Sequence, residues 1–220
     1  MRTRVKICGI TSVEDALAAI DAGADALGLV FYKPSPRYVE PDVAAEIIAR
    51  VPAFVTTMGL FVDASKDEIS SVLLKAPFDF IQFHGNESVA DCERIGKPYI
   101  KALSVGNEGG GLYGQALRNR MNEYKSARGL LLDTYQKGVP GGTGERFDWD
   151  QVPEPGPDDN QYIVLAGGLT PENVAEAVKS VRPYAVDVSG GVESAPGCKD
   201  ADRIRAFLDA VRYADSRLDL

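Results

Sequence analysis

Val5-Lys6-Ile7-Cys8-Gly9-Ile10-Thr11-Ser12-Val13-Glu14-Asp15 joins an apolar strand directly to the start of a helix. The strand ends on a cysteine and a glycine, and Thr11 followed three residues later by Glu14 has the pattern of a capping box. A strand-to-helix turn can hold one reactive side chain on a rigid support. Cys8, one of only three cysteines, is therefore the first candidate site residue.

The same strand-then-helix pattern recurs along the whole chain. The expected strands are Val5–Cys8, Ala26–Phe31, Thr57–Val62, Phe80–His84, Tyr99–Ser104, Gly129–Asp133, Tyr162–Ala166 and Ala185–Ser189. The expected helices include Val13–Ala22, Val43–Arg50, Lys66–Lys75, Val174–Val181 and Arg203–Tyr213. Alternation of strands and helices implies parallel strands with crossover helices. Eight such strands in 220 residues predict an α/β fold, a single (β/α)8 TIM barrel spanning residues 1–220, with its active site at the C-terminal mouth.

Composition excludes several classes of function. The net charge of −8, from 24 basic and 32 acidic residues, argues against a basic nucleic-acid-binding face. No apolar run approaches the roughly 18 residues of a membrane span, and the N-terminus lacks a signal-peptide pattern, so a cytoplasmic protein is expected. Three widely spaced cysteines predict no disulfide framework, and one histidine without a Cys-x-x-Cys pair predicts no metal site.

Strand alternation predicts which side chains point into the barrel. Successive residues of a strand face opposite sides, so polar residues at alternate positions near a strand's end would meet at the mouth. The polar or thiol residues placed inward in this way are Lys6, Cys8, Gln82, His84, Lys101, Asp133, Asp187 and Ser189. Convergence from five strands is hard to explain by packing alone, and it predicts an active site there.

Two glycine pairs predict a phosphate site. Gly167-Gly168 follows the seventh strand and Gly190-Gly191 follows the eighth, and each pair is expected to open a helix, with Pro171 suited to a first helical position. Glycine lets backbone N–H groups approach an anion, and the loops after strands seven and eight are the usual phosphate site of such barrels. The alternative interpretation of each pair is a tight turn.

Cys8 and Asp133 form a plausible base and acid. A thiolate can remove a carbon-bound proton, and a carboxylic acid can protonate an oxygen if partial burial favours its neutral form. Taken singly, Cys8 can equally be a buried structural thiol, and Asp133 the partner of an inward lysine. Arg37, on the proline-stiffened loop Lys33–Val39, can pair with a substrate carboxylate or remain a solvated charge. Lys6 is expected to form a structural ion pair with Asp187.

The sequence is less decisive for one pair of strand residues and for the segment after the sixth strand. His84 and Gln82 are either pocket lining or hydrogen-bonded core residues. The glycine-rich loop 141–144, which includes Gly142, is predicted to close over a ligand. The helix after the sixth strand is weakly indicated by 147–152 and is followed by a proline-rich loop at 153–157.

Seven motifs together resemble the phosphoribosylanthranilate isomerase family. They are Lys6-Ile7-Cys8-Gly9-Ile10-Thr11, Ser35-Pro36-Arg37, Gln82-Phe83-His84-Gly85, Leu132-Asp133-Thr134, Gly141-Gly142-Thr143-Gly144, Ala166-Gly167-Gly168-Leu169 and Asp187-Val188-Ser189-Gly190-Gly191-Val192-Glu193. The resemblance implies an aldose–ketose isomerase of tryptophan biosynthesis that performs an Amadori rearrangement without cofactor or metal. It also implies a small phosphorylated aminosugar as the ligand, and a monomer with a dimer as the alternative.

The resemblance also implies individual roles. Asp133 would protonate the furanose ring oxygen, Cys8 would remove the C2′ proton, and Arg37 would handle the anthranilate moiety. The phosphate would lie on Gly167, Gly168, Ser189 and Gly190, with His84, Gly142 and Asp187 as further substrate-binding candidates. Two departures are Phe83, where the family usually has leucine, and Ser104, where many members carry a basic residue. The alternatives are a histidine-pathway or dual-substrate isomerase and a non-catalytic sugar-phosphate-binding barrel.

Overall fold

The computed structural model describes residues 2–106, 111–134, 149, 152–153 and 162–218. Parallel strands form a closed barrel in chain order, in which β1 pairs with β8. The strands are β1 (Arg4–Cys8), β2 (Ala26–Val30), β3 (Thr56–Phe61), β4 (Phe80–Phe83), β5 (Tyr99–Val105), β6 (Gly129–Thr134), β7 (Tyr162–Leu165) and β8 (Ala185–Val188). The predicted TIM barrel is confirmed, with strand boundaries within one residue of those expected.

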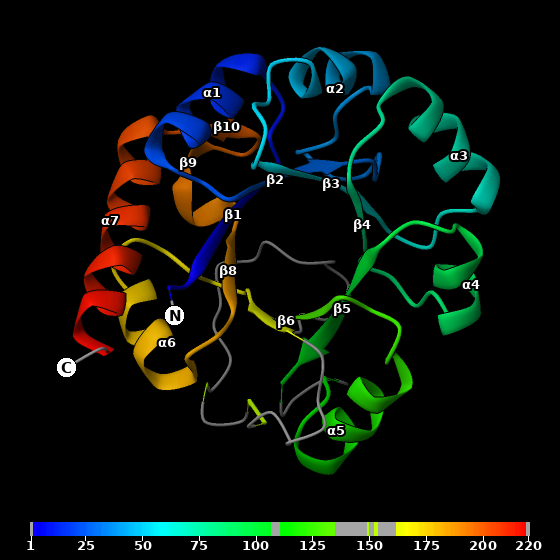
Figure 1. The fold of residues 1–220 in the computed structure, drawn as a ribbon. Coiled ribbons are helices and arrows are strands. Elements are labelled where there is room, and N and C mark those ends of the chain that lie inside the picture. The colour runs from blue at the N-terminus through cyan, green and yellow to red at the C-terminus, as the bar shows by residue number, and fades with distance from the viewer. Residues whose placement is uncertain (1, 107–110, 135–148, 150–151, 154–161, 219–220) are drawn as a thin grey trace.

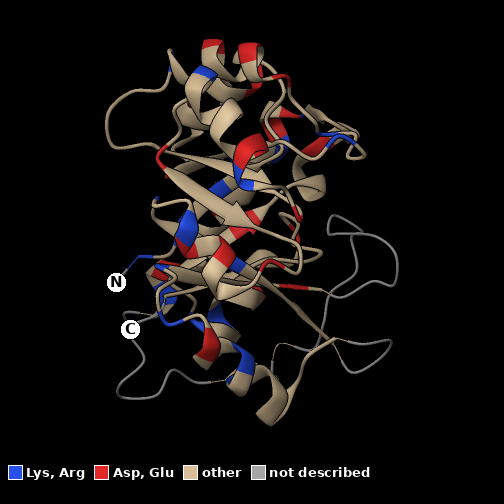
Figure 2. Cartoon of the chain, turned by 90° about the vertical axis from the view of Figure 1, so that its right-hand side faces the viewer, with Lys and Arg blue, Asp and Glu red and all other residues tan. Residues whose placement is uncertain are grey.

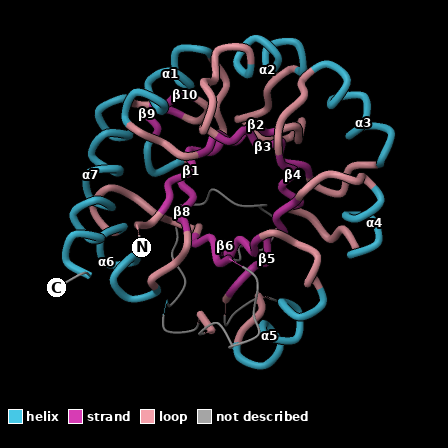
Figure 3. Tube along the Cα trace, in the orientation of Figure 1, coloured by secondary structure: helices cyan, strands magenta, loops and turns pink. Residues whose placement is uncertain are grey.

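Helices surround the barrel on its outside (Figures 1 and 3). They are α1 (Val13–Ala22), α2 (Pro41–Ile48), α3 (Lys66–Lys75), α4 (Val89–Arg94), α5 (Gly114–Glu123), α6 (Val174–Val181) and α7 (Ala201–Leu218). The long helix α7 packs between α6 and α1, which links the end of the chain to its beginning. Asp215 of α7 accepts hydrogen bonds from the Thr3 backbone N–H and hydroxyl at 2.8 and 2.7 Å.

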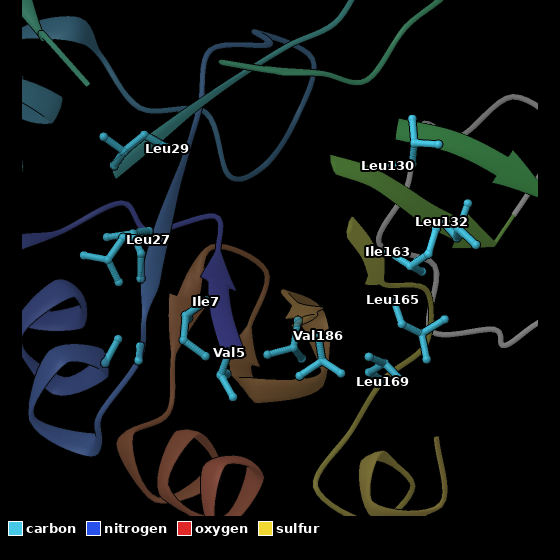
Figure 4. Close-up of a cluster of buried hydrophobic side chains, with 14 of the residues drawn as sticks. Val5, Ile7, Leu27, Leu29, Leu130, Leu132, Ile163, Leu165, Leu169 and Val186 are labelled. Atoms are coloured by element: carbon cyan, nitrogen blue, oxygen red, sulfur yellow. The ribbon is translucent and has the colours of Figure 1, made fainter. Parts of the chain in front are cut away.

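Two apolar layers follow from the strand alternation. One lies between the strands and the helices and contains the members labelled in Figure 4: Val5, Ile7, Leu27, Leu29, Leu130, Leu132, Ile163, Leu165, Leu169 and Val186. The other is a smaller cluster on the opposite face of the strands, inside the barrel: Ile100, Ala102, Leu131, Val164, Ala166 and Ala185. Burial of each large apolar side chain contributes about 1.5–3 kcal/mol. The interior is therefore packed, and the mouth is left for polar residues.

The predicted inward orientation of Lys101 is wrong. Ala102 pairs with Leu131 of the interior layer, and Lys101 pairs with Leu130 of the outer layer, so Lys101 faces the helices. Its ammonium lies 3.0 Å from Glu87 and 2.6 Å from the Gly85 carbonyl oxygen, and these partners make its full burial tolerable. Of the polar residues predicted to point inward, those that do so come from four strands. The inward position near the end of β5 is Ser104, which is exposed and pairs with Asp133.

Three local expectations are corrected at helix starts. Ser12 caps α1 and accepts from the Asp15 backbone N–H, whereas the Thr11 hydroxyl donates to the Gly197 carbonyl oxygen at 2.7 Å. Pro171 lies in a turn before α6, which begins at Val174. After β8 the chain forms only a short 3₁₀ helix, η2 (Gly190–Val192), and then an antiparallel hairpin of β9 (Glu193–Ala195) and β10 (Cys198–Lys199).

Some predictions lie outside the described residues. They include Gly142 with its loop at 141–144, most of the weak helix at 147–152, and part of the glycine-rich loop at 106–114. Within the described ranges, no helix is both long and apolar enough to cross a membrane. Acidic and basic residues are interspersed over the side of the molecule seen in Figure 2.

Candidate active site

A cavity of about 490 Å³ lies where the C-terminal ends of the strands meet. Every predicted site residue that the structure describes lines it: Cys8, Arg37, His84, Asp133, Gly167, Gly168, Asp187, Ser189 and Gly190. The volume falls in the range of sites for small organic ligands. Gln82 lines the cavity with His84, so these two residues belong to the pocket.

A hydrogen-bonded chain holds Asp133 at the end of β6. One carboxyl oxygen, Oδ2, lies 3.2 Å from Nε2 of His84, and Nδ1 of the same ring lies 2.9 Å from the amide nitrogen of Gln82. The other oxygen, Oδ1, accepts from the Thr134 backbone N–H at 2.8 Å. The carboxyl group therefore has a fixed orientation at the cavity wall, with the imidazole as its side-chain neighbour.

Gly167 allows the loop after β7, which is predicted to bind phosphate, to lie directly against the Asp133 carboxyl group. Its φ of +84° is in the left-handed region, which favours glycine. A Cβ at this position would lie 2.2 Å from Thr134 Oγ1, 2.6 Å from the Thr134 backbone nitrogen and 3.0 Å from Asp133 Oδ1. The loop after β7 and the end of β6 are thus in contact, which no local pattern in the sequence indicates.

Cys8 lies across the cavity on β1, next to a buried ion pair. Its side chain is buried against Val30 and Leu60. Burial raises the pKa of the Cys8 thiol, while the charge of Lys6 and a hydrogen bond from it act in the opposite direction. Lys6 Nζ lies 2.9 Å from Asp187 Oδ1, which confirms the predicted ion pair between β1 and β8.

Arg37 forms a two-pronged ion pair with Glu193. Its Nε and one terminal nitrogen donate to the two carboxyl oxygens, each at 2.9 Å, and Lys199 donates to the same carboxyl group at 2.7 Å. Burial would raise the pKa of Glu193, but the hydrogen bonds from Arg37 and Lys199 lower it overall. The guanidinium is thereby held at the cavity by the β9–β10 hairpin.

Sequence reasoning assigned no role to Glu193, Lys199 or Arg203. The hairpin that carries Glu193 and Lys199 had one available signal, the Pro196-Gly197 turn between two short runs. Arg203 belongs to α7, lines the cavity, and donates from Nε to the Gly191 carbonyl oxygen at 3.1 Å. It brings a positive charge to the glycine loops.

The loop after β7 has its own internal support. Gly168 has a φ of +62°, and its carbonyl oxygen accepts from the Asn173 amide at 2.8 Å. The side-chain oxygen Oδ1 of Asn173 accepts in turn from the Thr170 backbone N–H at 2.8 Å. In the described part of the chain, no group of three or more His, Cys, Asp or Glu side chains is placed to hold a metal ion.

A comparison with known families identifies the chain's relatives. The family described as N-(5′-phosphoribosyl)anthranilate (PRA) isomerase matches residues 5–210. The chain belongs to the PRA isomerase family. A PRA isomerase of Pseudomonas fluorescens strain Pf0-1 is 56% identical over 209 residues, covering 95% of this chain and 98% of the relative. The expected enzyme class, an isomerase of tryptophan biosynthesis, is confirmed.

Solved PRA isomerases share the whole barrel. The Thermotoga maritima enzyme is 41% identical, with a TM-score of 0.84 over 96% of this chain and 99% of that one. A second PRA isomerase structure is 38% identical, with a TM-score of 0.78 over the same shares of the two chains. That protein was crystallised with reduced 1-(o-carboxyphenylamino)-1-deoxyribulose 5-phosphate. These relatives favour the tryptophan-pathway family over the histidine-pathway and non-catalytic alternatives.

Proposed function

We propose that this PRA isomerase converts N-(5′-phosphoribosyl)anthranilate into 1-(2-carboxyphenylamino)-1-deoxyribulose 5-phosphate, with Asp133 as general acid and Cys8 as general base. The observation that carries the proposal is one cavity lined by both groups and by the two glycine loops. An aldose-to-ketose rearrangement needs a proton donor for oxygen and an acceptor for a carbon-bound proton. The two side chains supply these functions from different walls of the pocket.

Asp133 begins the reaction by protonating the furanose ring oxygen. The C1′–O bond breaks, the ring oxygen becomes the C4′ hydroxyl, and the nitrogen lone pair forms a cationic imine at C1′. Asp133 must hold a proton beforehand, and the side chains next to it can accommodate one. If the Gln82 amide presents Oε1, an atom without a partner among the described residues, then Nδ1 of His84 carries the ring proton. The His84 Nε2 atom then accepts from the protonated carboxyl group.

Cys8 then removes the C2′ proton. The adjacent cationic imine withdraws electrons from this C–H bond, so a base of modest strength suffices. The electrons of the C–H bond form the C1′–C2′ double bond of a neutral enolamine. Ketonisation places a proton on C1′ and releases the C2′ hydroxyl proton, so the net change is an isomerisation.

The remaining walls fit the two ends of the substrate. Gly167, Gly168, Ser189 and Gly190 form the phosphate end, and Arg203 adds positive charge there. At the other end, the cavity is lined by apolar and aromatic side chains: Val30, Tyr32, Leu60 and Val62. Arg37 lies at the cavity to receive the anthranilate carboxylate. The glycine loops and Arg203 lie at one end of the cavity only, which favours a substrate with a single phosphate group.

The experiment that tests the proposal follows the loss of fluorescent phosphoribosylanthranilate in wild type, Cys8→Ala and Asp133→Asn. Each substitution is expected to reduce turnover by about 10²–10⁴-fold, the usual contribution of general acid–base groups. Binding of reduced 1-(o-carboxyphenylamino)-1-deoxyribulose 5-phosphate should survive in both variants. Cys198→Ser, at an exposed cysteine, is the matched control for Cys8→Ala and should leave turnover unchanged. Wild-type turnover in either cavity variant, or turnover of the histidine-pathway substrate alone, would refute the proposal.

We also propose that residues 1–220 act as one catalytic unit in the cytoplasm. Support for a single unit comes from the closed barrel, in which β1 and β8 pair and residues of both strands line the cavity. Gel filtration of the active enzyme would decide between the expected monomer and a dimer. Activity in a membrane or periplasmic fraction would contradict the location.

A further inference from the structure

Lys6 is a buried charge that the proposed acid–base mechanism leaves without a task. It lies on the inner face of β1, two residues before Cys8, and its side chain is only 4% exposed. A buried ammonium group is costly unless it is paired, and an ion pair that serves only stability is often replaceable by apolar side chains. The charged pair therefore calls for an explanation beyond packing.

The structure brings the ammonium-bearing end of Lys6 next to the thiol. A Cβ on Gly28, the residue of β2 that pairs with Cys8, would lie 2.7 Å from Cys8 Sγ and 3.1 Å from Lys6 Cε. The Cys8 sulfur and Lys6 Cε therefore both lie beside the position that a side chain on Gly28 would occupy, and so they lie close to each other. Asp187 of β8, which lines the cavity, holds Lys6 Nζ at 2.9 Å and fixes its position.

We propose that Lys6 is a positioning residue for the base: its buried ammonium group stabilises the Cys8 thiolate and so determines how much thiolate is available to remove the C2′ proton. This inference rests on the proposed role of Cys8. Asp187 holds the ammonium group in place, but its own negative charge opposes the thiolate. The three side chains therefore form a line of alternating charges, carboxylate, ammonium and thiolate, along the β8–β1 seam.

The electrostatics agree with this geometry. Burial lowers the pKa of Lys6, but the negative charges of Asp187 and of the Cys8 thiolate outweigh it, so the pKa of Lys6 is raised. The other charges acting on Cys8 are Asp187, which raises the pKa of the thiol, and Lys199, which lowers it. The charge of Cys8 is also felt by Arg37 from the loop after β2. Lys6 is the largest influence on Cys8 that opposes burial.

The test measures the pH dependence of Cys8 alkylation by iodoacetamide, with the labelled peptide identified by mass spectrometry. A Cys198→Ser background removes the exposed thiol. An opposite charge within hydrogen-bonding reach typically moves a pKa by about 1–3 pH units. Lys6→Met should raise the alkylation midpoint by at least about 1 unit, which leaves about tenfold less thiolate at neutral pH. Lys6→Arg, which keeps the charge, should stay nearer to wild type.

Two further variants separate this effect from a general loss of structure. Asp187→Asn should lower the midpoint, because the asparagine side-chain oxygen can still accept from the Lys6 ammonium group and hold it in place, while the negative charge that opposes the thiolate is removed. If Lys6→Met alone does not fold, the double variant Lys6→Met/Asp187→Asn removes both charges, and its midpoint should still exceed that of Asp187→Asn. The matched control is Lys101→Met/Glu87→Gln, a buried lysine–carboxylate pair on the outer face of the barrel, which should leave the midpoint unchanged.

The results distinguish failure of this inference from failure of the proposed function. Equal midpoints in wild type and Lys6→Met, or a rise in Asp187→Asn equal to that in Lys6→Met, would overturn the role of Lys6. Retained turnover in Cys8→Ala would overturn the role of Cys8, and with it the task given to Lys6. A raised midpoint in Lys6→Met with a matching fall of about tenfold in kcat/KM at neutral pH would support both.

Discussion

Replacement of Gly167 by alanine is the sharpest test of how the site is assembled. The added Cβ would lie 2.6 Å from the Thr134 backbone nitrogen and 2.2 Å from its hydroxyl oxygen. The hydroxyl can rotate away, but the backbone nitrogen cannot. Either the loop after β7 or the end of β6 must therefore move, and both line the cavity. The substitution changes no group that performs chemistry.

Gly96→Ala is a control for the loss of stability and turnover in Gly167→Ala, because it introduces the same backbone strain without the steric overlap. Gly96 also has a positive φ, +73°, but a Cβ there meets nothing within 4 Å. Gly96→Ala should therefore cost only the left-handed strain of about 1–2 kcal/mol, a loss of roughly 2–8 °C in Tm for a chain of this size. Gly167→Ala adds displacement of Asp133. A misplacement of about 1 Å can reduce turnover by about 10²-fold.

The assay combines thermal unfolding with steady-state turnover of phosphoribosylanthranilate. Gly167→Ala should lower Tm by more than Gly96→Ala, because the steric overlap adds to the left-handed strain. At a temperature where both variants are folded, kcat should fall about 10²-fold in Gly167→Ala and remain near wild type in Gly96→Ala. Weaker binding of inorganic phosphate in Gly167→Ala alone would show that the phosphate loop moved as well. Equal kcat in the two variants would refute the argument that Gly167 sets the position of the acid.

Three further predictions concern the partners of the cavity residues. His84→Ala should lower kcat about tenfold, since it removes the hydrogen bond that orients the protonated Asp133 carboxyl group, and unchanged kcat would exclude a role in holding Asp133. Glu193→Gln should raise KM more than it lowers kcat, because Arg37 loses the carboxylate that orients it; steady-state kinetics with KM unchanged would contradict this. Because the pKa of Glu193 is lowered from its ordinary 4.5, the stability it contributes is present above that value and is lost as pH falls through the folded value. The difference in Tm between wild type and Glu193→Gln should therefore narrow as pH falls from about 7 to about 3, and a constant difference would contradict it.

The alternation of side chains along the strands explains why so much of the site was predictable from sequence. In a strand that packs on both faces, the register of the apolar residues fixes the direction of the polar ones. Val5 and Ile7 belong to the outer layer, so Cys8 must face the barrel's interior. The same reasoning places Asp133 correctly, since its neighbour Leu132 is in the outer layer.

Lys101 shows where this reasoning fails. Its neighbours Ile100 and Ala102 face the interior and are apolar, and Leu103 faces the helices and is also apolar. Both faces of the strand are therefore apolar. The pattern then carries no phase information, and the lysine was placed inward because it is polar. Its real environment is built from loop carbonyl oxygens and from Glu87, which lies 14 residues away in sequence. Partners of this kind cannot be read from a strand pattern.

The partners of Arg37 were missed for a related reason. A loop arginine in a sequence has no visible partner, and Glu193 lies 156 residues further along. The hairpin that presents Glu193 is only a few residues long, so its alternation is too short to be distinguished from a loop. The fold brings the two together at the mouth only because β1, β2 and β8 are neighbours in a closed barrel.

Because the barrel closes between β1 and β8, the acid and the base of the site depend on different contacts for their positions. Asp133 is held by His84 and by its own neighbour Thr134, whereas Cys8 depends on an ion pair whose members are 181 residues apart in sequence. That pair forms only when β1 and β8, the first and last strands of the barrel, associate. A barrel opened at this seam would keep its acid in place, but the Lys6 charge would lose its anchor and the thiol its stabilised anionic form. On the proposed role of Lys6, the base therefore becomes available only after the first and last strands of the barrel have paired, which couples barrel closure to chemistry at Cys8.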